Sequence, residues 1–330
     1  MRVGFCCLWE QDIETPKLEN QRTTTARFLA TLSEKARIDK LQHLVDANVA
    51  SLAASINHLC TFPASRRMFR IGGDLFPLFT HPTARELYES NAVKLPIDQL
   101  RHIGTQARAN DVRLSFHPGQ YTILQSANPG VVERGVAEFE YHARIAELLG
   151  YTGWHDSGFV INIHMGGKAK DCSAFRSIFQ SLSPTAQNLI TIENDEFTWG
   201  AEQLVDEVGD LCPIVLDLHH HAIFSGQHLS PTDPLVESIK LTWRGHRPKL
   251  HVAMSKEALI GEHVDASVEI DYPKLIGAGF SKSNLRQHSN TAWHKPTIDH
   301  WLSFAPDFDL MFEGKLKNIG QRAIFEHAMW

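Results

Sequence analysis

The chain has 330 residues, of which 43% are hydrophobic, and a formal net charge of −6. This length allows one or two domains, and no run approaches the roughly 18 uncharged apolar residues of a membrane-spanning helix. The acidic balance argues against a broad basic surface for nucleic acid, although bound divalent cations could supply positive charge locally.

The amino-terminal segment is predicted to be a strand rather than a targeting sequence. Acidic residues follow Val3–Cys6 too early for the apolar stretch of a signal peptide. The five cysteines are odd in number and lack a Cys-x-x-Cys pair, so we expect reduced thiols in a cytoplasmic protein. No pattern indicates oligomerisation, and we expect a monomer. The cysteines are Cys6, Cys7, Cys60, Cys172 and Cys212.

Short apolar runs alternate with longer amphipathic stretches along the whole chain. Eight of these runs have the length and the β-branched or aromatic content of buried strands. They are Val3–Cys6, Met68–Ile71, Val112–Phe116, Phe159–Ile163, Leu189–Ile192, Ile214–Leu216, Lys249–Val252 and Leu310–Phe312.

Helices are predicted between most of the strands. Ser33–Leu59 has apolar residues at helical spacing and opens with a serine that can act as N-cap. Pro96–Asn110 has a proline in its first turn, and Val131–Leu149 ends before Gly150. Repeated strands and helices of this kind are typical of a parallel α/β architecture.

Eight repeats favour a closed TIM (β/α)₈ barrel over an open sheet. Such a barrel needs about 250 residues before insertions, so a single barrel with long loops accounts for the length. We therefore expect a single domain over residues 1–330. The segment 277–296 lacks periodicity and is predicted to be a long loop before the last strand.

Basic residues gather in two places along the chain. One group consists of Arg66, Arg67 and Arg70, and the other lies within residues 244–249. Each run is by default a solvated surface, so neither one by itself indicates a nucleic-acid interface.

Six successive strands are each followed, or ended, by an imidazole or a carboxylate. The carboxyl ends of barrel strands converge on one face, where active sites are built. One such residue is more often a turn former or a helix cap, but six on six strands are hard to obtain in that way. Mixed nitrogen and carboxylate ligands suit Zn²⁺, Mn²⁺ or Fe²⁺, so the pattern predicts a metal site. The six residues are His117, His164, Glu193, Asp217, His251 and Glu313.

The segment after the sixth strand offers a further ligand. Asp217 and His220 are three residues apart in DLHH, a short reach that suits neighbouring metals. His219 and His221 compete for the same role because the three imidazoles are adjacent.

Three more polar residues belong to the same predicted face. His263 lies in a polar loop after the seventh strand, where it is either a ligand of a third metal or a solvated loop residue. His81 follows the second strand by about ten residues and, taken alone, is a loop histidine. Lys249 lies two residues before His251, so both side chains point to the same side of the strand. Because an ammonium cannot ligate a cation, Lys249 either contacts phosphate or is chemically neutralised.

The segment His117–Tyr121 reads HPGQY. A Pro-Gly pair after a strand marks a sharp turn, which would present Gln120 and Tyr121 at the mouth of the barrel. An aromatic ring beside an amide can stack on bases and hydrogen-bond within a distorted base pair. An ordinary loop with Tyr121 packed on the rim is the alternative.

At these residues the chain resembles the UV damage endonucleases, from Met1 to about Lys317. SFHPGQY (115–121) and TIENDE (191–196) are highly specific together with the Asp-x-x-His and Lys-x-His segments. The resemblance implies a TIM barrel that binds up to three divalent metal ions, usually manganese, with Zn²⁺ as another possible metal. It also implies incision of damaged double-stranded DNA immediately 5′ of pyrimidine dimers, 6-4 photoproducts and some abasic sites.

The resemblance also implies individual roles. His81 would lie beside the metals near the scissile phosphate, and Gln120 and Tyr121 would probe the damaged pair. Lys249 matches a lysine that can be carboxylated. The family tends to have a lesion-contacting tyrosine near the end of the first strand. Phe5 is the nearest match to it in this chain, so the tyrosine hydroxyl is missing here. The implied metal ligands are His117, His164, Glu193, Asp217, His220, His251, His263 and Glu313.

From the ligand series we also hypothesise a catalytic role for Glu193, which would bridge two metals. Three other functions remain open. A metal-dependent sugar isomerase also has histidine, glutamate and aspartate at the ends of its strands, but the HPGQY segment and His263 argue against this function. An abasic-site endonuclease with little photoproduct activity would share the ligands and differ at the probing loop. A catalytically silent damage binder would keep the metals for structure, but structural sites normally contain fewer ligands.

Overall fold

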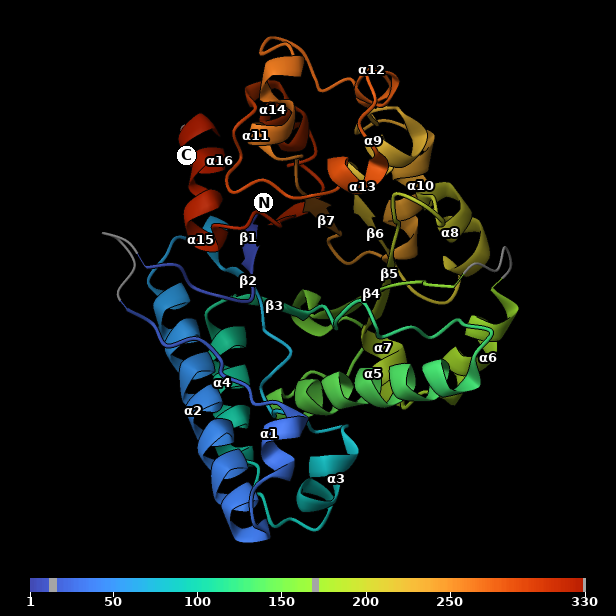
Figure 1. The fold of residues 1–330 in the computed structure, drawn as a ribbon. Helices are drawn as coiled ribbons and strands as arrows, with labels where there is room; N and C mark the ends of the chain where they lie inside the picture. The colour runs from blue at the N-terminus through green and yellow to red at the C-terminus, as the bar shows by residue number, and fades with distance from the viewer. Residues whose placement is uncertain (12–16, 168–171, 329–330) are drawn as a thin grey trace.

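The computed structural model describes residues 1–11, 17–167 and 172–328. Within these residues, eight parallel strands close into a barrel in chain order, and β1 pairs with β8. Figure 1 shows the strands at the centre of the molecule with the helices around them. The predicted TIM barrel is therefore confirmed. The strands are β1 Val3–Cys6, β2 Met68–Arg70, β3 Arg113–Phe116, β4 Val160–His164, β5 Ile190–Glu193, β6 Ile214–Asp217, β7 Lys249–Val252 and β8 Asp309–Phe312.

Helices follow the strands and cover the outside of the barrel (Figure 1). In chain order the α-helices are α1 Ala26–Ala30, α2 Glu34–Cys60, α3 Pro82–Glu89, α4 Ile97–Ala109, α5 Pro129–Leu149, α6 Ser173–Ser181, α7 Pro184–Leu189, α8 Ala201–Val208, α9 Leu218–Ser225, α10 Pro234–Thr242, α11 Glu257–Ile260, α12 Tyr272–Gly277, α13 Lys282–Leu285, α14 Lys295–Ser303, α15 Lys317–Gly320 and α16 Arg322–Ala328. Short 3₁₀ turns are η1 Ala64–Arg66, η2 Asp156–Gly158 and η3 Gly261–His263. Among the described residues, none of these helices has the length and apolar character to cross a membrane.

Local signals in the sequence explain where the long helices begin and end. The Ser33 side chain accepts a hydrogen bond from the backbone N–H of Ala36 and caps α2. Gly150 ends α5 in the left-handed conformation, with φ of 87°, which glycine adopts without strain. Pro96 lies at the cap of α4 rather than inside its first turn.

The predicted long loop at 277–296 is partly wrong. It contains helix α13, which Ser281 caps through its side chain, and α14 begins at its end. Ser255 and His288 also form an isolated antiparallel bridge that ties the loop to the segment after β7. A helix of four residues is shorter than two turns, so it leaves no periodicity in the sequence.

Residues alternate along each strand between the barrel interior and the surrounding helices. On β1, Val3 and Phe5 join the large hydrophobic core, whereas Cys6 packs against Met68 and Met311. Polar side chains occupy much of the remaining interior, and they form two layers. One layer lies at the amino-terminal end of the strands and the other at the carboxyl-terminal end.

The amino-terminal layer is a charged cluster around Asp309, whose side chain is fully buried. Its carboxylate accepts hydrogen bonds from Arg113 at 2.9 Å, Arg247 at 2.9 Å and Arg2 at 3.0 Å. Burial alone would raise the pKa of Asp309, but Arg113 and Arg2 outweigh this effect and lower it to about 2. The cluster therefore closes this end of the barrel with paired charges.

Neither basic group of the sequence forms a free cationic surface. Arg247 binds Asp309, and Arg244 stacks on the ring of Trp154 at 3.8 Å. Arg67 donates to the backbone carbonyls of Cys60, Phe62 and Asn110. These residues precede β2 and β7, so they lie at the end of the barrel opposite the strand-end histidines.

Candidate metal centre at the carboxyl ends of the strands

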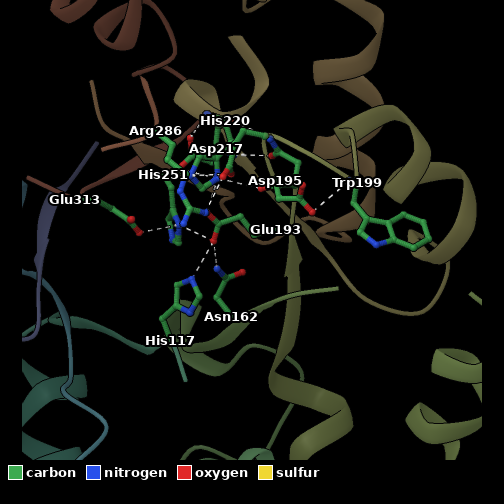
Figure 2. A network of polar contacts seen from close by, with 12 residues as sticks. His117, Asn162, Glu193, Asp195, Trp199, Asp217, His220, His251, Arg286 and Glu313 are labelled. Atoms are coloured by element: carbon green, nitrogen blue, oxygen red, sulfur yellow. Dashed lines mark hydrogen bonds and ion pairs between the residues drawn. The ribbon is translucent and has the colours of Figure 1, made fainter. Parts of the chain in front are cut away.

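The carboxylate of Glu193, the last residue of β5, belongs to two groups of metal-ligating side chains. One group contains His117, Glu193, His251 and Glu313, and the other contains His164, Glu193 and His220. Within each group the ligand atoms lie within 4.8 Å of one another. Glu193 is 1% exposed, and Figure 2 shows it at the centre of the network. The structure thus brings six predicted ligands together around one carboxylate-centred site.

The first group is held by short contacts on both sides of His251. The Nδ1 of His251 lies 2.8 Å from the Glu193 carboxylate and 3.1 Å from that of Glu313. The Nε2 of His117 lies 3.2 Å from Glu193. Arg70 forms an ion pair with Glu313 and lies 3.1 Å from the Nε2 of His251. The guanidinium therefore fixes the positions of two ligands.

The second group lies where β6 leads into α9. Asp217 caps α9 by accepting a hydrogen bond of 2.7 Å from the backbone N–H of His220. This cap places the His220 ring 3.8 Å from Asp217 and 3.7 Å from Glu193. The ring of His164 lies 5.7 Å from that of His220, centroid to centroid. Asp217 therefore orients a neighbouring ligand through the backbone, whereas its own carboxylate, a predicted ligand, belongs to neither of the two groups.

Burial and neighbouring charged groups shift the pKa values of the side chains in this site. Burial raises the pKa of Asp217 to about 8, and the nearby Glu193 and Glu313 add to the effect although His220 opposes it. Burial lowers the pKa of His251 to about 3 despite the pull of Glu193, so its ring is neutral at physiological pH. Burial also acts against a charged His220, but Asp217 and Glu193 raise its pKa to about 9. The site favours added positive charge at His220.

Buried donor atoms with unused lone pairs fit a metal at this site. Glu193 Oε1, Asp217 Oδ2 and His164 Nδ1 have no hydrogen-bond partner among the residues that the structure describes. An unpaired buried carboxylate oxygen is costly unless a cation satisfies it. Imidazole and carboxylate donors together suit a divalent transition metal.

Of the three consecutive histidines, His220 enters the metal-ligating groups. His219 instead lies 3.2 Å from the hydroxyl of Ser255, and its ring packs against Tyr272. Burial lowers the pKa of His221 to about 4. The geometry therefore agrees with the assignment of His220 by Asp-x-x-His spacing, and His219 has other partners.

Lys249 lies in the barrel interior, next to His251 along β7. It is 1% exposed, and its Nζ has no hydrogen-bond partner within the described part of the chain. Burial, together with Arg70 and Arg113, holds its pKa well below the usual range. The structure thus places the amine in the barrel interior, and contact with phosphate and chemical neutralisation both stay predictions.

Phe5, His263 and His81 also lie outside the two groups. Phe5 is fully buried and packs edge-to-face on Trp9 at 4.7 Å, so the expected contact with a lesion is wrong. His263 is exposed and its ring packs on Phe280. His81 is exposed and caps α3, where its Nδ1 accepts a hydrogen bond from the backbone N–H of Thr83.

The HPGQY turn stands at the mouth of the barrel. Tyr121 is 81% exposed and lines an open hollow of about 530 Å³ together with His81 and Gly119. Gln120 is also exposed and lines a smaller recess that reaches His117. The interpretation of Tyr121 as a residue packed on the rim is therefore wrong.

Several residues around the ligands were not singled out in the sequence. Asn162 donates to Glu193, and the Nδ1 of His288 lies 2.9 Å from the Glu313 carbonyl oxygen. Arg286 donates to Glu196 at 2.8 Å, and Glu196 lies 3.8 Å from His220. Asn162 and Glu196 lie within conspicuous motifs. His288 and Arg286 lie in the aperiodic segment, where nothing marks them.

Comparisons with known proteins find similarity over nearly the whole chain. The family model described as UV-endonuclease UvdE matches residues 1–328. The chain is 27% identical over 335 residues to a UV-damage endonuclease from Schizosaccharomyces pombe, covering 98% of this chain and 50% of that protein. This chain therefore spans about half the length of that relative.

Two further comparisons cover more of the matching protein. The chain is 28% identical over 308 residues to a UV DNA damage endonuclease from Bacillus cereus (strain B4264), covering 90% of this chain and 86% of that protein. The crystal structure of SacUVDE matches with a TM-score of 0.72 and 22% identity, covering 100% of this chain and 97% of that one. The structural likeness confirms the shared fold.

Proposed function

The chain belongs to the UV-endonuclease UvdE family, and on that premise we propose that it is a metal-dependent endonuclease that cuts damaged double-stranded DNA. The observation that carries the proposal is the position of Glu193, whose one carboxylate serves two groups of metal-ligating side chains. Two-metal sites with a shared ligand are typical of enzymes that cleave phosphodiesters.

We propose that the two groups hold divalent cations, up to three in all. Manganese is the expected metal, with Zn²⁺ as the other candidate. When bound, the cations would polarise the phosphodiester and favour deprotonation of water near neutral pH. His263 would have to move from Phe280 to contribute to a third position. The ligands are His117, His164, Glu193, Asp217, His220, His251 and Glu313, with His263 as the eighth candidate.

Residues of the chain itself keep these ligands in place. Arg70 holds Glu313, and Asn162 holds Glu193 by donating to its carboxylate. Partners of this kind orient metal ligands and tune their basicity. Lys249 is proposed to act as a positioning residue, because a neutral buried amine is the form that can take up carbon dioxide. The resulting carbamate would place an anion beside the ligands.

The mouth of the barrel would select the lesion. A pyrimidine dimer, a 6-4 photoproduct or an abasic site is poorly stacked, so displacing it costs less than displacing an intact pair. Gln120 and Tyr121 are exposed and free to enter the resulting gap. His81 lines the same hollow as Tyr121 and would contact the strand near the scissile phosphate. The proposed cut is immediately 5′ of the lesion.

Incision of defined duplexes tests the proposal. Duplexes with a dimer, a 6-4 photoproduct or an abasic site would be compared with an undamaged duplex, in Mn²⁺, Mg²⁺ or Zn²⁺. We expect one cut 5′ of the lesion, with a 3′-hydroxyl and a 5′-phosphate. Full activity after the metals are removed, or equal cutting of undamaged DNA, would contradict the proposal.

An abasic-site endonuclease with little photoproduct activity is the second candidate. It is favoured by one observation: Phe5, the residue nearest to the lesion-contacting tyrosine that the resemblance implies, is fully buried in the core and does not face the rim. The same assay distinguishes the two candidates, because an enzyme of the second kind would cut the abasic duplex and leave both photoproduct duplexes intact.

A further inference from the structure

A second group of metal-ligating side chains lies outside the barrel mouth. His228 follows α9, Glu269 precedes α12, and His300 lies on α14. Their ligand atoms lie within 4.8 Å of one another, and the Nδ1 of His228 is 3.7 Å from the Glu269 carboxylate. The two imidazole rings stand almost perpendicular, at 81°, with centroids 5.3 Å apart. Three separate segments thus direct ligands towards one point.

Backbone hydrogen bonds fix the form of both imidazoles. The Nε2 of His228 donates to the Ile270 carbonyl oxygen at 2.8 Å, and the Nε2 of His300 donates to that of Leu229 at 2.7 Å. Because a carbonyl oxygen only accepts, each Nε2 carries a proton, and Nδ1 is the nitrogen left to bind a cation. Histidine ligands of metals are commonly held by a hydrogen bond of this kind from the second nitrogen.

The geometry points to a cation site. We propose that His228, Glu269 and His300 bind one divalent transition-metal ion of the Zn²⁺ class, with water completing the coordination. Two imidazoles and a carboxylate favour Zn²⁺ over Mg²⁺ or Ca²⁺, which prefer oxygen ligands. Zinc with ligand bonds of about 2.1 Å in a tetrahedron has its ligand atoms about 3.4 Å apart. The 3.7 Å contact between His228 and Glu269 is close to that distance.

The site is reachable from solvent and separate from the proposed endonuclease centre. The side chains of His228 and Glu269 are 22% and 39% exposed, so a cation can enter without unfolding. Tyr272 stands between the two regions, with its ring 6.1 Å from that of His228 and 5.7 Å from that of His219. Bound metal would tie α14 to the segments that flank α9 and α12, and it would stabilise the folded chain by binding to it alone.

Zinc counting tests this proposal on the full chain. The protein would be stripped with a chelator, reloaded with ZnCl₂, desalted and measured by elemental mass spectrometry. The double variant His228→Gln/His300→Gln is expected to retain one zinc fewer per chain than the parent. Loss of a residue that only hydrogen-bonds to a metal ligand commonly lowers metal affinity by about 10- to 100-fold. Loss of two ligands should therefore lower the zinc affinity by more than about 100-fold. The same zinc content in both proteins would overturn the proposal.

A matched control separates the site from general loss of histidines. His43 and His102 are both exposed, and the double variant His43→Gln/His102→Gln removes the same number of imidazoles. It should keep the parent's zinc content, and a loss equal to that of the site variant would overturn the proposal. Incision with Mn²⁺ is expected to be unchanged in both variants, so failure of the endonuclease proposal would leave this test intact.

Anomalous diffraction at the zinc edge provides a second measurement that needs no variant. Crystals of the parent protein soaked in ZnCl₂ should show a peak between the imidazoles of His228 and His300 and the carboxylate of Glu269. Zinc at the barrel mouth with none between these three side chains would overturn the proposal. This result remains decisive if the double variant folds poorly.

Discussion

Replacing Glu193 by glutamine removes one negative charge from both groups of metal-ligating side chains while keeping the volume of the side chain. A pair of unit charges 4 Å apart in a partly screened interior interacts by about 4 kcal/mol. That free energy corresponds to about 10³-fold in rate or affinity. Because the carboxylate is 1% exposed and its ligand atoms are within 4.8 Å of those of both groups, little solvent screening reduces this effect. We therefore expect Glu193→Gln to lower incision by at least about 10³-fold.

Single-turnover incision of a dimer-containing duplex at saturating Mn²⁺ measures this loss, and elemental mass spectrometry of the same sample counts bound manganese. Glu202→Gln makes the same chemical change at an exposed position on α8 and should leave both readouts at the parent level. Thermal unfolding of both variants checks that the fold is kept. Near-normal incision by Glu193→Gln with metal present would refute the bridging role of this carboxylate.

Three further predictions concern the rim, the interior amine and the base of the barrel. Tyr121→Ala should reduce the preference for damaged over intact duplex by about tenfold, because stacking on one base contributes about 1–3 kcal/mol; competition between the two duplexes measures it, with manganese content unchanged. Lys249 should show a carbamate signal by NMR with ¹³C-bicarbonate, and a signal that persists in Lys249→Met would assign it elsewhere. Asp309→Asn should lower the free energy of unfolding at pH 7 by about 3 kcal/mol or more, because it leaves Arg113 buried without its anion. The pKa of Asp309 is lowered to about 2 in the folded chain, so its ionisation stabilises the fold by about 2 kcal/mol. This stabilisation is complete above the ordinary pKa of 3.8 and is lost as the pH falls through 2. Urea unfolding across that pH range should show a narrowing difference between the free energies of unfolding of parent and variant.

The sequence predicts the barrel and its rim well because both depend on local patterns. A buried parallel strand is a short apolar run, and its carboxyl end is marked by the first polar residue that follows. His117, His164, Glu193 and Asp217 all stand at such points. In a closed barrel these points meet, so positions far apart in the chain can be placed together without knowledge of the loops.

Residues whose roles depend on long-range packing could not be predicted in the same way. Arg70 belongs to a run of arginines in the sequence, but its place on β2 directs it into the barrel towards Glu313. His288 reaches the same carboxylate from a segment without periodicity. Phe5 illustrates the opposite error, because alternation along β1 turns its ring towards the outer core rather than the rim. Strand register, which the sequence leaves open by one residue, decides the cases of Arg70 and Phe5.

The two polar layers of the barrel differ in how their charges are balanced. At the amino-terminal end, the single carboxylate of Asp309 is surrounded by three arginines, and its low pKa shows that it is fully compensated. At the carboxyl-terminal end, Glu193, Glu313 and Asp217 share the interior with Arg70, with the neutral ring of His251 and with His220, whose pKa is raised to about 9. Burial, with Glu193 and Glu313 nearby, raises the pKa of Asp217 to about 8 although His220 opposes the shift, so the neighbouring positive charge does not fully offset the burial of this carboxyl group. The first layer thus pairs its carboxylate with three arginines, whereas the second leaves Glu193 Oε1 and Asp217 Oδ2 without a hydrogen-bond partner among the described residues. This difference is the physical reason for proposing metals at the rim.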